Sequence, residues 1–181
     1  MLFRSRGKGG SFRLVVNYLS LAASMSLLAP WQARGDFDVM LVYEPSPVTI
    51  GIPARIIRGF KGIPIVFWVQ DLWPQSLSAT GAVKSPAMLA IVDALVRWIY
   101  RGCNRILVQS RAFIDPICTQ GIDRERVAYL PNSAEDFYRR ETPMAKDPAA
   151  SEFRPGFRVL FAGNVGAAQD FPTIVAAAAR L

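Results

Sequence analysis

Two acidic residues stand where short apolar runs of the sequence end. Glu44 follows the run Val39–Tyr43, and Asp71 follows Pro64–Val69 after one glutamine, Gln70. Two carboxylates at one edge of a sheet can bind a sugar or act as acid and base. The chain has no histidine, which excludes a Ser-His-Asp triad and a Cys-His pair and leaves chemistry to carboxylates, amides, hydroxyls and backbone dipoles. Each carboxylate also fits the simpler role of a helix or turn cap.

Amides and hydroxyls follow the later apolar runs in the same way. Gln109 and Ser110 come after Arg105–Val108, and Asn132 comes after Val127–Leu130. We expect these side chains to bind a ligand by hydrogen bonds, although Ser110 also fits the N-cap of the next helix.

Aromatic rings and a glycine turn complete the set of candidate groups. Trp68 and Trp73 flank the same edge and could stack on a sugar ring, with core packing favoured for Trp68. The turn Gly163–Gly166 precedes a helical pattern over Phe171–Leu181 and offers backbone N–H groups to an anion, although two glycines alone are weak evidence.

The elements that position these groups alternate between strand and helix. The four apolar runs are continuous, which predicts buried strands covered on both faces. The intervening segments predict a helix over Ile52–Phe60, a loop over Gln70–Lys84, a helix capped by Ser85 and ended before Gly102, and a helix over Arg111–Gln120. This pattern predicts an α/β fold with a doubly wound, parallel, Rossmann-like sheet, and ligands bind such sheets at the carboxyl ends of the strands.

The composition divides the chain into three parts. Residues 1–132 form a partial first domain, residues 133–156 lack periodicity and form a linker, and residues 157–181 open a second Rossmann-like domain with a strand over Val159–Ala162. Because that strand has no partners in the sequence, we expect the chain to be a fragment that enters a second domain without completing it.

The first 34 residues carry five arginines and lysines and no acid. Such a segment suits anionic lipid headgroups, lipid-linked diphosphates or nucleic acid, or is simply a solvated basic surface. Nucleic acid binding has no aromatic interleaving or motif in its favour. The uncharged stretch Leu14–Ala33 predicts a long, mostly buried helix, with a surface-lying membrane contact as the alternative, because polar residues dilute it too far for a span.

The two cysteines, Cys103 and Cys118, have no metal-binding spacing and no histidine to complete a zinc set. We therefore expect free, half-buried thiols, no metal site and a cytoplasmic protein.

Five stretches together resemble family 4 retaining glycosyltransferases of the glycosyltransferase-B fold, in particular the bacterial enzymes of exopolysaccharide and O-antigen assembly. The stretches are VYEPSP at 42–47, VFWVQDLWPQSLSATGAVKS at 66–85, RILVQSRAF at 105–113, LPNSAED at 130–136 and FAGNVGAAQDFPTI at 161–174. Their order along the chain agrees with that of the family.

The resemblance implies two facing Rossmann-like domains, of which the first binds the acceptor and the second binds the nucleotide-sugar donor. It implies catalytic roles for Asp71 and Glu44, with no metal and no cofactor beyond the nucleotide-diphosphate sugar that serves as donor. The acceptor-binding residues it implies are Gln70, Trp73, Ser110 and Asn132. The donor-binding residues it implies are Gly163, Asn164, Gly166 and Gln169.

This sequence departs from many relatives at three of these positions. Relatives place His-Asp where this chain has Gln70 and Asp71, and an arginine and a lysine where it has Asn164 and Gln169. The charge of a donor diphosphate would then be met by backbone dipoles or by residues outside these stretches.

The resemblance thus implies a fragment, truncated at both ends, of a transferase. That transferase would move a sugar from a nucleotide-diphosphate sugar to a lipid-linked or saccharide acceptor in cell-surface polysaccharide biosynthesis. Such a protein would be cytoplasmic, with peripheral contact to an anionic membrane and no nucleic acid partner. The alternative is a non-catalytic Rossmann-like binding module, or one chain of a split glycosyltransferase.

Overall fold

The computed structural model describes residues 11–81, 83–136, 159–163, 165 and 169–180. The chain divides into two compact units, Met1–Asn132 and Ser133–Leu181, which are described separately below. Most of the predicted linker, from residue 137 onward, lies outside the described residues. The division of the chain into functional domains therefore stays a prediction.

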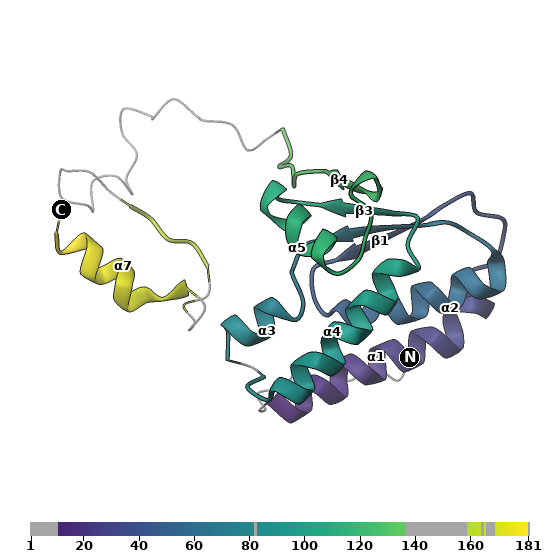
Figure 1. Cartoon of the computed structure of the whole chain (residues 1–181), viewed down its shortest axis with the longest axis horizontal. Coiled ribbons are helices and arrows are strands. Elements are labelled where there is room, and N and C mark those ends of the chain that lie inside the picture. The colour runs from purple at the N-terminus through teal and green to yellow at the C-terminus, as the bar shows by residue number, and fades with distance from the viewer. Residues whose placement is uncertain (1–10, 82, 137–158, 164, 166–168, 181) are drawn as a thin grey trace, which may run out of the picture. The chain divides into compact units, whose positions relative to one another are not determined.

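The described part of the first unit contains a parallel sheet of four strands (Figure 1). The strands are β1 (Met40–Glu44), β2 (Ile65–Val69), β3 (Arg105–Val108) and β4 (Val127–Tyr129). Their order in the sheet, β1-β2-β3-β4, is their order in the sequence, and Val42, Phe67 and Ile106 are aligned across the first three. The α/β class and the Rossmann-like parallel sheet are confirmed, and each predicted strand of this unit is found within one residue at either end.

Helices connect these strands. The longer ones are α1 (Ser11–Gln32), α2 (Gly51–Lys61), α4 (Pro86–Arg101) and α5 (Ile114–Thr119). Single 3-10 turns cover Val48–Ile50, Arg111–Phe113 and Arg124–Arg126. The predicted start of α4 is confirmed, because the Ser85 hydroxyl accepts a hydrogen bond from the Met88 N–H at 3.5 Å.

The segment Gln70–Lys84 was predicted to be a loop, but it contains the short helix α3 (Gln75–Ala79). The Ser76 N–H donates to the Leu72 carbonyl, and the Thr80 hydroxyl donates back to the Ser76 carbonyl at 2.8 Å. The Thr80 side chain therefore bonds to a backbone carbonyl one helical turn earlier, at the end of this short helix.

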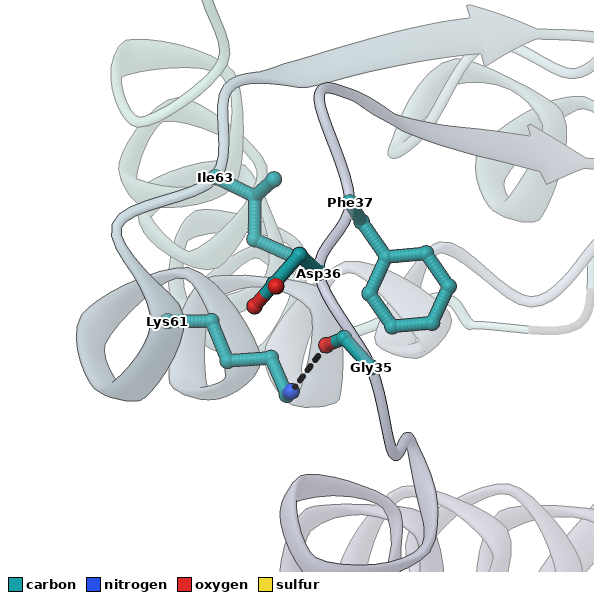
Figure 2. A pocket seen from close by; sticks show the side chains of 5 residues that line it. All are labelled: Gly35, Asp36, Phe37, Lys61 and Ile63. Atoms are coloured by element: carbon teal, nitrogen blue, oxygen red, sulfur yellow. Dashed lines mark hydrogen bonds between the residues drawn. The ribbon is translucent and has the colours of Figure 1, made fainter.

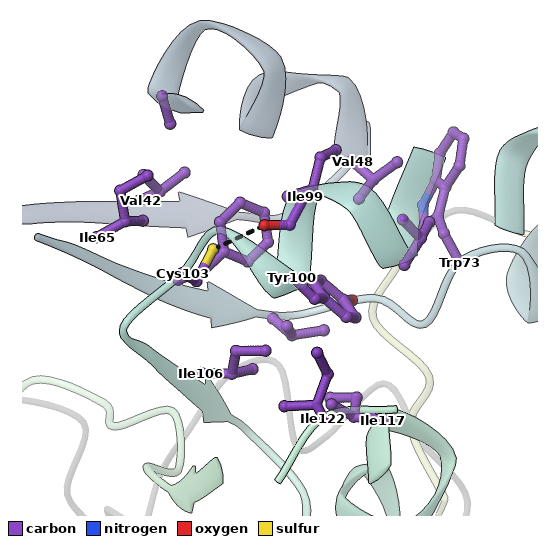
Figure 3. Packing of buried hydrophobic residues seen from close by; sticks show 14 of the residues in the cluster. Val42, Val48, Ile65, Trp73, Ile99, Tyr100, Cys103, Ile106, Ile117 and Ile122 are labelled. Carbon is purple, nitrogen blue, oxygen red and sulfur yellow. Dashed lines mark hydrogen bonds between the residues drawn. The ribbon is translucent and has the colours of Figure 1, made fainter. Parts of the chain in front are cut away.

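The core lies on one face of the sheet. Alternate strand residues, including Val42, Phe67 and Val108, are buried against helices, and Figure 3 shows Ile99 and Tyr100 of α4 in the same cluster. On β1, Leu41 and Tyr43 alternate with the buried Val42 and Glu44 and are 60% and 49% exposed. The expectation that both faces of this strand are covered is wrong for the described residues. The strand order never reverses, so right-handed crossovers carry each connecting helix to the same side.

Three arginines tie the helical layer to the carboxyl end of α4. Arg55 donates to the Trp98 carbonyl, Arg58 to that of Gly102, and Arg126 to that of Cys103. Trp98 belongs to the last turn of α4, where carbonyls lack partners within the helix, and Gly102 and Cys103 follow directly after it. The cations also complement the helix dipole. Cys103, beside them, is a free thiol like Cys118. Its burial raises its pKa to about 12 in spite of the nearby arginines, so it stays protonated.

Gly51 allows α2 to approach α4 closely. A Cβ at this position would collide with the Ile99 side chain, whose Cδ1 would lie only 3.0 Å away. We expect Gly51→Ala to lower the free energy of unfolding by about 1–3 kcal/mol, measured by urea denaturation, because the core must shift to accept a methyl group. Gly59→Ala in the same helix is the matched control, since no atom lies within 4 Å of its added Cβ. It is expected to stabilise by about 0.5–1 kcal/mol, and equal losses in both variants would contradict the packing argument.

In the second unit, α7 (Phe171–Ala178) begins where the predicted helix begins. The predicted strand over Val159–Ala162 is not present among the described residues of this unit, where 159–162 carry no strand structure. A parallel strand requires neighbouring strands to accept its hydrogen bonds, and none is found in the part of 133–181 that the structure describes. Phe161 instead packs edge-on against Phe171, with ring centroids 4.9 Å apart.

Candidate functional site

The polar residues predicted for the first unit meet at the carboxyl edge of the sheet. Glu44 is the last residue of β1, Gln70 and Asp71 follow β2, and Asn132 follows β4 by three residues. Because parallel strands all end at the same edge, residues far apart in the sequence become neighbours, such as Gln70 and Asn132, 62 positions apart.

Gln70 is the residue through which this edge is connected. Its N–H donates to the Glu44 carbonyl at 3.1 Å, and its own carbonyl accepts from Nε2 of Gln109 at 3.2 Å. Its side-chain Oε1 accepts from Nδ2 of Asn132 at 2.7 Å. The ends of all four strands are thereby fixed to one another, which holds the adjacent Asp71, half-buried, in a defined place.

Glu44 is fully buried, on the face of β1 that packs against the helices. Neither carboxylate oxygen has a hydrogen-bond partner in the part of the chain that the structure describes. Burial raises its pKa to about 8, and the charge of Asp71 adds to the rise. The nearby backbone N–H groups of Asp71 and Gln70 oppose it without forming hydrogen bonds of ordinary geometry. Glu44 therefore carries a proton at neutral pH.

Other polar groups are buried beside Glu44. The Tyr100 hydroxyl is enclosed in the core, and burial raises its pKa well above the usual value, with the Glu44 charge as the next cause. Gln120 donates from Nε2 to the Trp73 carbonyl at 3.4 Å, while its Oε1 is buried without a partner among the described residues. A layer of interior polar atoms thus underlies the edge at which Asp71 lies.

The two candidate indoles have exchanged the surroundings that the sequence suggested: Trp73 lies in the core, and Trp68 lies on the open face of the sheet. Trp73 is 6% exposed and packs in the core against Tyr18, at 6.3 Å between ring centroids (Figure 3). Trp68 lies on the open face, edge-on to Tyr43, and its Nε1 donates to the Leu130 carbonyl at 3.1 Å. The expectation of core packing for Trp68 is wrong, because Phe67 and Val69 on either side of it point to the helices.

Ser110 occupies the cap position that its simpler interpretation predicted. Its hydroxyl accepts a hydrogen bond from the Ala112 N–H at 3.3 Å, at the start of the turn Arg111–Phe113. That leaves the Ser110 O–H hydrogen available for a second partner, because a hydroxyl can donate and accept at once.

The four predicted donor-binding residues belong to the second unit. Gly163 and Gln169 are exposed, and Asn164 and Gly166 lie outside the described residues. Within residues 11–136 and the described parts of 159–180, no group of three histidine, cysteine or acidic residues is arranged to hold a metal. Among the same residues, no helix has the length and apolar character needed to cross a membrane.

A pocket of about 260 Å³ lies at the opposite end of the strands (Figure 2). It is lined by Gly35, Asp36, Phe37, Lys61 and Ile63. The Lys61 ammonium donates to the Gly35 carbonyl at 3.1 Å and lies over the Phe37 ring. Its cation is thus engaged in closing the loop before β1.

A family model described as glycosyl transferase 4-like domain matches residues 4–133, more than two thirds of the chain. The chain belongs to this family. No curated protein matches it. A glycosyltransferase 4-like domain implies a nucleotide-sugar donor and an acceptor, and the match covers the whole sheet and its carboxyl edge, including Asp71. The carboxyl edge is therefore the candidate active site of a glycosyltransferase.

Sequence reasoning missed two buried polar residues beneath this candidate site, Tyr100 and Gln120. Tyr100 stands four residues after Val96 and one after Ile99, so it shares the buried face of α4. That spacing was a usable signal for its burial, but not for its position beside Glu44. Gln120 ends α5 before Gly121 and gave no signal at all, since a terminal glutamine is usually solvated.

Proposed function

We propose that this chain forms the acceptor-binding side of a retaining glycosyltransferase, which moves a sugar from a nucleotide-diphosphate sugar to a lipid-linked or saccharide acceptor in cell-surface polysaccharide biosynthesis. The observation that carries the proposal is the position of Asp71, held by the Gln70 hydrogen bonds at the carboxyl edge of a family 4-like sheet. No cofactor or metal is assigned to the reaction.

Asp71 is the catalytic residue of this proposal. The acceptor hydroxyl attacks the anomeric carbon from the same face as the departing diphosphate, so that the configuration is retained. The bond from that carbon to the diphosphate oxygen breaks, and the nucleoside diphosphate leaves with the electron pair. The acceptor proton passes to the Asp71 carboxylate. Glu44 carries its own proton inside the core, so it acts through Asp71 as a positioning residue rather than on the substrate.

The polar groups around Asp71 supply acceptor binding. Asn132 and Ser110 lie at this edge with donors or acceptors left for sugar hydroxyls, and Gln70, whose Nε2 is buried, contributes by orienting Asn132. Trp73 is buried in the core, so its part in acceptor binding is to support the loop after β2 and not to contact the sugar. For the donor, the proposal keeps Gly163, Asn164, Gly166 and Gln169, through backbone N–H groups and the amides of the two polar residues.

The proposal is tested by measuring sugar transfer with the complete protein encoded by the reading frame that contains these residues. A panel of nucleotide sugars is offered with lipid-linked and soluble saccharide acceptors, and the anomeric configuration of the product is read by NMR. We expect one donor to be consumed with retained configuration. Tight acceptor binding without turnover, restored only by a second gene product, would favour the split enzyme instead. Neither binding nor turnover with any of the pairs would end the proposal.

A further inference from the structure

The outer side of α1 presents a continuous apolar ridge. Val15, Leu19, Ala23, Leu27 and Trp31 recur every four residues, and all are exposed. Exposure is greatest near the carboxyl end of the helix, where Leu27 is 71% exposed and Trp31 is 79% exposed. A step of four residues turns an α-helix by only about 40°, so each residue of this set adjoins the next, and the five form an oblique band across the outer side of the helix, the α1 ridge.

The other side of α1 is already used for packing. Asn17 and Ala22 are buried, and Tyr18 reaches the core at Trp73. The helix lies beside α2, with which it makes its most extensive contact (Figure 1). The expectation of a mostly buried helix is therefore wrong in one respect, because the protein covers only one side. A helix facing water normally carries polar residues outward, and the α1 ridge has none.

Charge identifies what covers the ridge. Arg13 and Arg34 stand exposed at its two ends, and the first 34 residues contain no acid. Two copies meeting through this surface would bring like charges together around an apolar contact. An anionic lipid surface instead offers negative headgroups to the arginines and acyl chains to the leucines and valine.

We propose that the α1 ridge docks on an anionic phospholipid surface, with the helix lying in the headgroup layer. Trp31 then lies at the polar–apolar boundary, the location that indoles favour in membranes. The inference rests on the proposed function in one respect, since a lipid-linked acceptor would be presented at that surface. The docking itself depends only on the ridge and its arginines.

Vesicle binding tests the proposal directly. The complete gene product is sedimented with vesicles of phosphatidylcholine and phosphatidylglycerol, and with vesicles of phosphatidylcholine alone. We expect binding to the anionic vesicles, a blue shift of tryptophan emission that is lost in Trp31→Phe, and weakening by salt. Arg34→Gln is expected to weaken binding about fivefold, and Leu27→Glu at least about tenfold.

Leu41→Glu is the matched control. Leu41 is similarly exposed, at 60%, but lies on the open face of the sheet, away from the helices. It is expected to leave vesicle binding unchanged, and thermal melts by circular dichroism confirm that both glutamate variants fold. Absence of binding to anionic vesicles, equal losses in Leu27→Glu and Leu41→Glu, or a ridge variant that only converts a dimer to a monomer would each overturn the proposal.

Transfer to a soluble acceptor separates this inference from the proposed function. Vesicle binding that fails while soluble transfer proceeds refutes the docking alone. Binding that responds to Leu27→Glu while no nucleotide sugar is consumed supports the docking and refutes the transferase proposal.

Discussion

Replacing Glu44 with glutamine is expected to remove a pH dependence of stability that the wild-type chain shows between about pH 4.5 and pH 8. In the unfolded chain this carboxyl ionises near 4.5, whereas in the folded chain burial holds its pKa near 8. The folded state therefore binds more protons than the unfolded state across this interval, and stability falls as the pH rises through it. Below the lower value the contribution is fully present.

The size of this effect follows from the displacement of the pKa. The wild-type chain is expected to lose on the order of a few kcal/mol of unfolding free energy across the interval. Glutamine has the shape of the protonated carboxyl and cannot ionise, so Glu44→Gln should match the wild type at the acid end and exceed it at the alkaline end. Urea denaturation at pH values below, within and above the interval measures this difference.

Glu125→Gln provides the control for that series. Glu125 is exposed, so the same change of acid to amide is expected to keep the wild-type pH profile. A wild-type profile that stays flat across the interval, or a Glu44→Gln variant that is destabilised equally at every pH, would show that Glu44 is solvated or paired in the folded protein.

Replacing Asp71 with asparagine is expected to lower kcat/KM for sugar transfer by about a hundredfold to ten-thousandfold in the complete gene product. The amide keeps the shape and the backbone contacts of Asp71 but cannot accept the acceptor proton. The rate is measured with the donor and acceptor that the panel described above identifies. Asp36→Asn, at the opposite end of the strands beside the pocket of Figure 2, is expected to leave the rate unchanged.

The same variant gives a second result that does not depend on activity. The charge of Asp71 is the second cause of the raised pKa of Glu44, after burial. Asp71→Asn is therefore expected to move the alkaline end of the stability profile to lower pH. If the rate falls and the profile does not move, the two carboxyls are not neighbours, and the candidate site is wrong in its geometry even though Asp71 is needed.

The convergence of Glu44, Gln70, Asp71 and Asn132 could be predicted from the sequence, because it depends only on the direction of the strands. The ends of parallel strands share one edge whatever their side chains do. Which way each side chain faces could not be predicted in the same way. The run Val39–Tyr43 is apolar at every position, so it shows no alternation from which to tell that Val42 and Glu44 point inward while Leu41 and Tyr43 point outward.

The prediction of helix α1 is confirmed, but the prediction that the helix is mostly buried is wrong, because one of its sides is exposed. A helix that is apolar on all sides is normally buried, and the sequence of Leu14–Ala33 gives no sign that one side lacks a protein partner. The unformed strand at Val159–Ala162 has a related cause. Its apolar residues specify an extended conformation, but pairing depends on other strands, which a local sequence pattern does not supply.

The four strands follow one another across the sheet in sequence order, and this order affects how a ligand can bind at their carboxyl ends. In open α/β folds a hollow forms where successive connections turn in opposite directions, and the described strands contain no such divergence. The loops that follow these strands stand side by side along one edge of the sheet. In the proposed transfer reaction, a long or branched saccharide acceptor would therefore lie across the ends of several strands.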